Sequence, residues 1–276
     1  MSMIPHKIYP AGRDDWVSTW INVVNGVKEF NVAFDSKSAP IDLHTAASKN
    51  AQLIRADFNK PLYIAMSGGV DSEFVANTFL KEQIPFTPVI LRINKYNYPE
   101  YWFAEYWCKQ NNITPIYLDF TGPEFLTLVK KYITDGIVPR LYGYLTHLIV
   151  ADHVNSIGGV LVSGEGDPEF NEQSKMFMCD QVDFITDIHR PGHHPTCFFM
   201  YTPEIALSYV IDFDPDKSER DNKFRMYGVS PRPKFNYTDY LNAVEILPPL
   251  FLEGIEKARK KFTYGSKEHM IAQLSK

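Results

Sequence analysis

A short apolar run that ends at a pair of glycines restricts the folds open to this chain more than any other segment. Residues 62–66 (LYIAM) are followed by Ser67, Gly68, Gly69, Val70, Asp71 and Ser72. A short run bounded by glycines is typical of a strand buried on both faces of a parallel sheet. Apolar residues then recur over 74–80 at the spacing of one helix face. The segment predicts a strand, a tight turn and a helix that begins at Asp71 or Ser72.

Strand and helix patterns continue to alternate along the chain. Further strands are predicted over residues 88–93, 116–118 and 160–163, and helices over 99–110, 122–136, 141–155 and 203–211. Pro123 and Gly136 delimit one of these helices, because proline fits the first turn and glycine the position past the end. Alternation of this kind implies parallel strand pairing. The expected fold class is therefore α/β, with a doubly wound, mostly parallel sheet.

The two ends of the chain flank this predicted core. Residues 1–60 indicate a strand over 29–34 and a helix over 41–55, and we expect them to form an N-terminal extension packed on the core. The core domain is expected to span residues 61–276. Its pattern loosens between residues 167 and 232, apart from the helix already named. Residues 237–276 are predicted as one or two helices with a basic run at 257–261.

The composition limits which binding partners and which cellular compartment fit this chain. The chain of 276 residues carries 28 basic and 33 acidic side chains, a formal net charge of −5 that disfavours a polyanionic partner such as DNA or RNA. Cys108, Cys179 and Cys197 form no C-x-x-C pair and fit a reducing environment. No stretch resembles a signal peptide or approaches the roughly 20 apolar residues of a membrane helix. We expect a soluble, cytoplasmic protein.

The residue types in the glycine turn suit the binding of phosphate groups. Gly68 and Gly69 allow a close backbone approach, so that N–H groups and the positive end of the following helix point at an anion. Ser67 and Ser72 add hydroxyl donors, and Asp71 is a hard oxygen ligand for Mg²⁺. The turn lacks the G-K-[ST] ending of a Walker A loop. It therefore does not suggest cleavage of ATP between the β- and γ-phosphates.

The S-G-G-V-D-S segment resembles the signature of the PP-loop superfamily, the N-type ATP pyrophosphatases, whose members cleave ATP between the α- and β-phosphates. The resemblance implies an adenine nucleotide α-hydrolase-like fold of HUP type, with ATP and Mg²⁺ as cofactors. The implied nucleotide contacts are the six residues from Ser67 to Ser72 together with Leu91 of the next strand, and Asp71 is the implied metal ligand. A helix opened by a serine–glycine turn for structural reasons alone is the alternative.

A second segment is similar to part of the synthetase domain of asparagine synthetase and β-lactam synthetase. Residues 163–169 (SGEGDPE) look like the S-G-E-G-x-D-E segment of those enzymes. The resemblance implies that Glu165 is a substrate-site residue and candidate general base. Pro168 occupies the position of the family's metal-binding aspartate, so Asp167 is the candidate metal ligand. Open α/β sheets place ligands at the carboxyl ends of strands, where both segments would lie.

Two features of the remaining sequence bear on this chemistry. Residues 232–235 (RPKF) look like the late basic segment whose lysine holds the α-phosphate and pyrophosphate, which makes Lys234 a candidate catalytic cation. The chain begins Met1-Ser2, without the catalytic cysteine and glutaminase domain of glutamine-dependent asparagine synthetases. The nitrogen would therefore come from free ammonia, a separate protein or an amino group of a second substrate.

Other patterns leave alternatives open. An acid and histidine cluster could bind a metal, but Pro191-Gly192 interrupts it and a loop covering the site fits better; its members are Asp183, Asp187, His189, His193 and His194. Aromatic residues over 96–107 could stack bases, although helical spacing favours core packing. The leading hypothesis is an AMP- and pyrophosphate-forming ligase for a small carboxylate or amide. An adenylating tRNA-modifying enzyme and a non-catalytic nucleotide-binding module are the alternatives.

Overall fold

A five-stranded parallel sheet lies at the centre of the protein. The computed structural model describes residues 17–24, 27–34, 41–94, 97–134, 142–171, 176–178 and 196–229. The sheet has the order β5-β4-β3-β6-β9, and each pair of neighbours is parallel. Its strands are β3 (Leu62–Ala65), β4 (Thr87–Ile93), β5 (Ile116–Phe120), β6 (Val160–Ser163) and β9 (Thr196–Cys197). The predicted α/β class and parallel pairing are confirmed.

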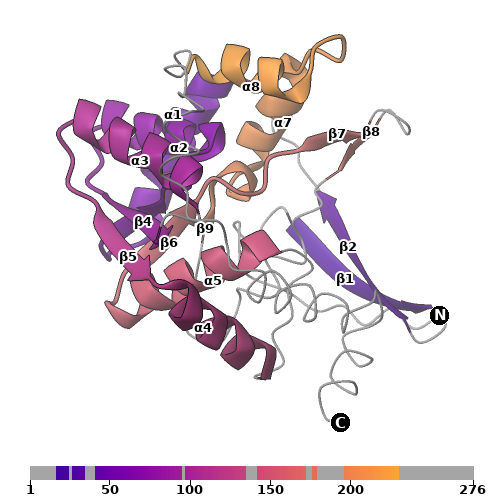
Figure 1. The fold of residues 1–276 in the computed structure, drawn as a ribbon. Coiled ribbons are helices and arrows are strands. Elements are labelled where there is room, and N and C mark those ends of the chain that lie inside the picture. Colours follow the sequence, from indigo (N-terminus) through magenta and orange to yellow (C-terminus); the bar gives the residue numbers. More distant parts are fainter. Residues whose placement is uncertain are drawn as a thin grey trace.

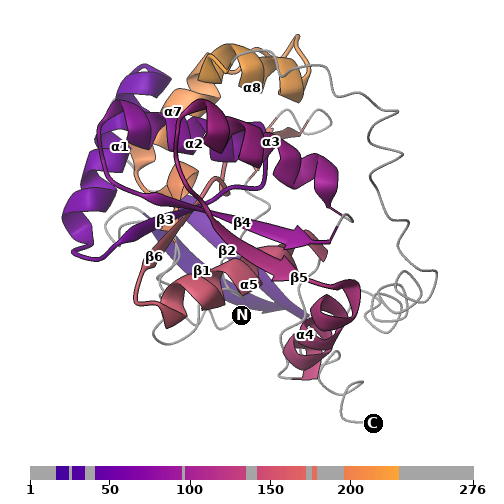
Figure 2. The same cartoon turned by 60° about the vertical axis from the view of Figure 1, so that its left-hand side comes forward.

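Helices cover both faces of this sheet, as a doubly wound fold requires. In Figures 1 and 2 one face is covered by α1 (Leu43–Asp57), α2 (Val70–Lys81) and α3 (Tyr98–Gln110), with α7 (Pro203–Asp212) and α8 (Glu219–Tyr227) on the same side. The opposite face carries α4 (Gly122–Thr134) and α5 (Tyr142–Ser156). A short 3₁₀ helix, η1 (Phe198–Met200), follows β9.

The central strand shows why both faces must be covered. Leu62 and Ile64 of β3 belong to the hydrophobic core under α1 and α2, whereas Tyr63 and Ala65 belong to the core shared with α5. Successive side chains of a strand point to opposite faces, so an uninterrupted apolar run is stable only between two layers. The apolar pattern that predicted this strand therefore also requires a layer of helices on each face of the sheet.

The chain reverses its direction of travel across the sheet at β3. From β3 the chain moves one way, to β4 and β5, and later returns to place β6 on the other side of β3. In open α/β sheets such a switch point leaves a crevice beyond the carboxyl ends of the two adjacent strands, where ligands bind. The S-G-G-V-D-S turn follows β3 and the S-G-E-G-D segment follows β6, so both open at this switch point.

The sequence predicted some of the elements outside the central sheet and missed others. A hairpin of β1 (Val17–Val24) and β2 (Val27–Phe34) precedes α1, and β7 (Glu169–Asn171) pairs with β8 (Met176–Met178). Helix α1 packs into the main core through a row of small and apolar residues; these are Leu43, Ala46, Ala47, Ala51 and Ile54. Helix α8 falls where the sequence pattern loosens and where no helix was predicted. Within the described ranges no helix is both long and apolar enough to cross a membrane.

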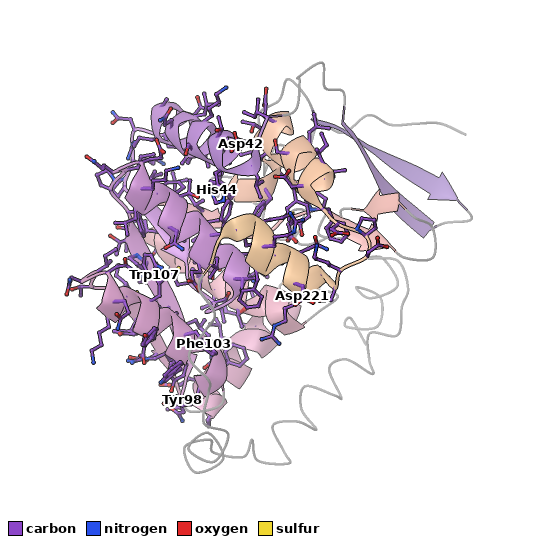
Figure 3. All side chains as sticks on the ribbon, turned by 90° about the horizontal axis from the view of Figure 1, so that it is seen from above. Asp42, His44, Tyr98, Phe103, Trp107 and Asp221 are labelled. Atoms are coloured by element: carbon purple, nitrogen blue, oxygen red, sulfur yellow. The ribbon has the colours of Figure 1, made fainter. Side chains whose placement is uncertain are left out.

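The aromatic stretch on α3 divides between core and surface. Tyr101 and Trp107 are 8% and 6% exposed and belong to the main core, which agrees with the expected core packing. Trp102 stacks on Tyr106, with ring centroids 5.5 Å apart and planes 14° from parallel, and Tyr106 is 40% exposed. Tyr98, Phe103 and Trp107 mark the length of the helix in Figure 3. One side of α3 thus presents aromatic rings outside the core.

Candidate functional site

The glycine turn after β3 has the conformation that its sequence predicts. Gly68 has φ +81°, a left-handed conformation that glycine adopts without strain, and Gly69 is the N-cap of α2. The Ser67 hydroxyl accepts a hydrogen bond from the Gly69 amide at 3.1 Å and lies 3.3 Å from Ser72 Oγ. Ser72 Oγ also donates to the Gly69 carbonyl. The helix begins at Val70, one residue earlier than predicted, so its N-terminus opens directly from the turn.

The segment after β6 packs against this helix terminus through its backbone. A Cβ placed on Gly164 would lie 2.8 Å from the Ser72 nitrogen and 2.9 Å from the Asp71 carbonyl carbon, closer than real Cβ contacts. Only a residue without a side chain permits this approach. Gly164 thus brings the two segments singled out in the sequence into contact at the switch point.

A buried lysine of α8 joins the acidic residues of both segments. Lys223 Nζ lies 3.1 Å from Asp71 Oδ1 and 2.7 Å from Asp167 Oδ2, and Glu219 one turn earlier is 3.2 Å away. Asp167 and Lys223 are 4% and 9% exposed. The Tyr227 hydroxyl donates to Asp71 Oδ1 at 2.8 Å. One ammonium therefore compensates two carboxylates that come from opposite sides of the switch point.

Burial sets the protonation behaviour of this cluster. Desolvation, together with the negative charge of Asp71, raises the pKa of Asp167 to about 7, against the opposing effect of Lys223. Burial lowers the pKa of Lys223, but the charges of Asp167 and Asp71 outweigh it, so that the pKa lies well above its ordinary value. Lys223 is therefore charged at neutral pH, and its charge is what permits Asp167 to ionise in a buried position.

Aromatic packing holds α8 in place beneath the turn. The Tyr227 ring stacks on Phe74 of α2, with centroids 4.4 Å apart and planes 19° from parallel, and also on Phe199 of η1 at 5.7 Å. Phe74 and Phe199 are buried. Because Phe74 belongs to the helix that follows the glycine turn, this stack fixes α8 relative to the turn and keeps Lys223 and Tyr227 beside Asp71.

The second candidate residue, Glu165, is paired with a histidine of α5. His147 Nε2 lies 3.0 Å from Glu165 Oε1, and the side chains are 17% and 23% exposed. Burial raises the pKa of Glu165, but the hydrogen bond and charge of His147 and the charge of Lys223 outweigh it and lower the pKa below its ordinary value. Glu165 is therefore an ionised, partly accessible carboxylate close to the cluster around Lys223.

The carboxylates of Asp71 and Asp167 are oxygen donors of the kind that Mg²⁺ binds. The position between them is taken by the Lys223 ammonium, which lies 3.1 Å from Asp71 Oδ1 and 2.7 Å from Asp167 Oδ2. Among the described residues, no group of three or more histidine, cysteine, aspartate or glutamate side chains is placed to hold a metal. The two predicted metal ligands do lie together, but around Lys223.

The remaining predicted residues are placed as follows. Leu91 lies in β4, its side chain is 8% exposed and belongs to the core on the α5 side, and its carbonyl accepts a hydrogen bond from Asn97. Ser72 is 4% exposed, and the hydrogen bonds of its hydroxyl lie within the turn. Lys234 and the acid and histidine cluster at 183–194 lie outside the described residues.

Lys223 and His147 are among the site residues that the sequence analysis missed. Lys223 belongs to a polar helix without a continuous apolar stripe. His147 comes from the middle of α5, the helix that precedes β6 and Glu165. A signal for α8 was present, because Ser218 and Asp221 begin it as an N-cap pattern and Gly228, at φ +61°, ends it. No comparable signal marked His147.

Fold and site together define a doubly wound α/β protein with a helix-opening glycine turn and an acidic second segment at its switch point. No protein-family model matches the chain, and a search among curated proteins finds no match. Three solved structures resemble it distantly. NMN synthetase from Francisella tularensis is 13% identical, with coverage of 79% of this chain and 93% of that chain and a TM-score of 0.40.

The other two are similarly remote. The NH3-dependent NAD synthetase from Campylobacter jejuni is 11% identical over 80% of this chain and 93% of its own, with a TM-score of 0.39. The U34-tRNA thiolase from Methanococcus maripaludis is 14% identical over 78% of each chain, with a TM-score of 0.35. At these identities and TM-scores the similarity assigns no activity to this chain.

Proposed function

We propose that this protein is an ATP-dependent ligase of the PP-loop type, in which a substrate carboxylate or amide oxygen attacks the α-phosphorus of ATP. The bond between the α-phosphorus and its bridging oxygen to the β-phosphorus breaks, pyrophosphate leaves, and an acyl or imidoyl adenylate forms. A nitrogen nucleophile then displaces AMP and forms an amide, as in asparagine synthetase-like enzymes. Ammonia, an amine substrate or a separate nitrogen-supplying protein provides the nucleophile.

The observation that carries this proposal is the contact of Gly164 with the N-terminus of α2. The turn that suits phosphate binding and the segment that carries Glu165 meet at the switch point, with no room for a side chain between their backbones. An anion at the α2 terminus and a nucleophile beside Glu165 would therefore be neighbours. Proximity of this kind is what a two-step transfer through a bound adenylate needs.

Different residues of the chain contribute to adenylate formation and to the attack by the nitrogen nucleophile. The backbone amides of the turn and the positive end of α2 bind the phosphates of ATP and stabilise the departing pyrophosphate. Glu165 is ionised, so it accepts a proton from the nitrogen nucleophile, and His147 holds its carboxylate in position. Lys234 remains the candidate cation for the α-phosphate. Asp71 and Asp167 are the residues that would hold a magnesium ion, which would supply positive charge to the phosphates, although in this structure both carboxylates contact Lys223.

Product analysis tests the reaction class directly. The protein is incubated with Mg²⁺, ATP labelled at the α-phosphate, a panel of small carboxylic acids and amides, and an ammonium salt, and the products are separated. Formation of AMP and pyrophosphate that depends on one of the acids supports the proposal. Formation of ADP and phosphate instead would reject it.

A matched pair of variants tests the role of Glu165. Glu165→Gln removes the proposed base, and Glu82→Gln makes the same chemical change at the half-buried C-cap of the helix that begins at the turn. We expect Glu165→Gln to bind ATP with unchanged affinity and to lose amide formation by roughly 10²–10⁴-fold, the usual contribution of a general base. Glu82→Gln should keep the wild-type rate. If Glu165→Gln forms the amide at the same rate as Glu82→Gln, Glu165 is not the base.

The stacked rings of Trp102 and Tyr106 favour one alternative, an adenylating enzyme that acts on a nucleobase of tRNA. Exposed aromatic rings bind unstacked bases at about 1–3 kcal/mol each. An electrophoretic shift with tRNA that weakens at higher salt and with Tyr106→Ala would support this alternative. Unchanged mobility of tRNA at low salt would remove it.

A further inference from the structure

We propose that the Lys223 ammonium occupies the cation position between Asp71 and Asp167 in the free protein, so that a divalent metal reaches this acid pair only by displacing it. The inference concerns the protein without nucleotide and does not depend on the proposed ligase activity. It assigns Asp167 to Lys223 rather than to a metal.

The contacts of Lys223 are those of a shared counter-ion. Its Nζ lies 3.1 Å from Asp71 on the β3 side of the switch point and 2.7 Å from Asp167 on the β6 side. A bridging divalent cation would bind the same two carboxylates, at shorter distances and from the position that the ammonium takes. Two cations in this space would repel each other across a few ångströms of poorly solvated protein, so occupancy by one excludes the other.

Residues of α8 itself also keep the Lys223 ammonium in place. Glu219 contacts Nζ from one turn earlier, and Tyr227, one turn later, donates to Asp71 and stacks on Phe74. The ammonium is tied to an element that packs against α2, so moving it away from the pair would break buried ion pairs. A metal must therefore overcome contacts that the fold itself maintains, and the free wild-type protein should bind it weakly.

Titration with Mn²⁺, followed by the electron paramagnetic resonance of the free ion and without nucleotide, tests this. Lys223→Met removes the ammonium and keeps much of the side-chain volume, whereas Lys223→Arg retains a cation. We expect Lys223→Met to bind one Mn²⁺ at least about tenfold more tightly than wild type, a difference of about 1.4 kcal/mol. Lys223→Arg should resemble wild type. Adding Asp167→Asn to Lys223→Met should abolish the gain.

A second comparison does not require Lys223→Met to fold. In the wild-type background the ammonium should keep Mn²⁺ off the acid pair, so the tightest Mn²⁺ binding of the wild-type chain should lie elsewhere and should be unchanged by Asp167→Asn. The proposal is overturned if Asp167→Asn weakens Mn²⁺ binding by the wild-type chain, or if folded Lys223→Met binds Mn²⁺ no better than wild type. Neither result would bear on whether ATP yields AMP, so failure here leaves the ligase proposal separately testable.

Discussion

At the scale of single residues, Gly164 is the position of the site where an added side chain would meet backbone atoms. A methyl group there would meet the Ser72 nitrogen at 2.8 Å and the Asp71 carbonyl carbon at 2.9 Å, and both are backbone atoms that cannot rotate away. We expect Gly164→Ala to cost about 1–3 kcal/mol, as overpacking does, and to push the β6 segment from the turn. A displacement of about 1 Å can lower a rate roughly 10²-fold.

Gly158→Ala is the matched control for this variant. Gly158 precedes β6 and has φ +74°, so alanine there carries backbone strain, but nothing lies within 4 Å of the added methyl group. Thermal unfolding and the rate of AMP formation are measured for both variants. We expect both to lose stability and only Gly164→Ala to lose activity out of proportion. Equal activities would mean that the backbone contact is not needed for catalysis.

Glu165 gives a pH dependence whose sign follows from its environment. Its pKa in the folded protein lies below the ordinary value of 4.5 because of His147 and Lys223. The ionised carboxylate therefore stabilises the fold fully above the unfolded pKa, and this contribution is lost as the pH falls through the lowered folded pKa. Glu165→Gln should be less stable than wild type at pH 7 by about 1–2 kcal/mol. The difference, measured by urea unfolding, should shrink as the pH falls below 4.5.

The same residues show where sequence reasoning succeeds at this scale. Gly68 was recognisable because a special backbone position selects glycine whatever surrounds it. Glu165 was singled out through a local motif, and its role stays a prediction. Lys223 was not singled out, because its role comes from a contact with Asp71, 152 positions away in the chain, and an isolated lysine in a polar stretch looks solvated.

At the scale of elements, α8 shows that capping residues can define a helix that periodicity does not reveal. Its sequence, ERDNKFRMY, has no continuous apolar stripe, because the polar residues Asn222 and Lys223 are buried beside Met226 and Tyr227. The side-chain amide of Asn222 donates to the carbonyls of Asp214 and Lys217. Apolar spacing reveals helices whose buried face is apolar, whereas α8 also buries polar groups that the site requires.

The N-cap of α8 should therefore influence the site from a distance. Ser218 Oγ accepts a hydrogen bond from the Asp221 amide at 3.1 Å. Ser218→Ala should destabilise the protein by about 0.5–2 kcal/mol, whereas Ser218→Thr keeps a capping hydroxyl and should lose less. If fraying of α8 loosens Lys223, Ser218→Ala should also bind Mn²⁺ more tightly than Ser218→Thr. Chemical unfolding and the metal titration measure the two effects, and equal stabilities would show that the cap contributes nothing.

At the scale of the whole molecule, the parallel sheet was predictable because each of its main strands is an apolar run between two layers. The strands β3, β4 and β6 were located almost to the residue, and α2, α3, α5 and α7 followed from helical spacing. No local sequence pattern predicts the spatial order β5-β4-β3-β6-β9. The strand β9 has only two residues, which is too short for a recognisable strand pattern. Strand order depends on contacts between distant segments, which periodicity does not record.

Two buried cysteines report on the two layers of this fold separately. Cys108 belongs to the core on the α1–α3 side of the sheet and Cys197 to the core on the α4–α5 side, and each is 2% exposed. Burial, with a smaller effect of Glu105, raises the pKa of the Cys108 thiol to about 11. At pH 8 the reactive thiolate of native Cys108 is then roughly one part in a thousand, so we expect no alkylation without unfolding.

Alkylation in increasing urea tests whether the layers unfold together. With Cys179 replaced by serine, single-cysteine variants keep either Cys108 or Cys197, and labelling is followed by mass spectrometry. Both layers share β3 and β6, whose alternate side chains enter both cores, so neither layer can be lost without exposing the other face of the same strands. We expect the two thiols to become reactive at the same urea midpoint. If Cys197 reacts at clearly lower urea than Cys108, the α4–α5 layer opens independently and the sheet does not couple its two faces.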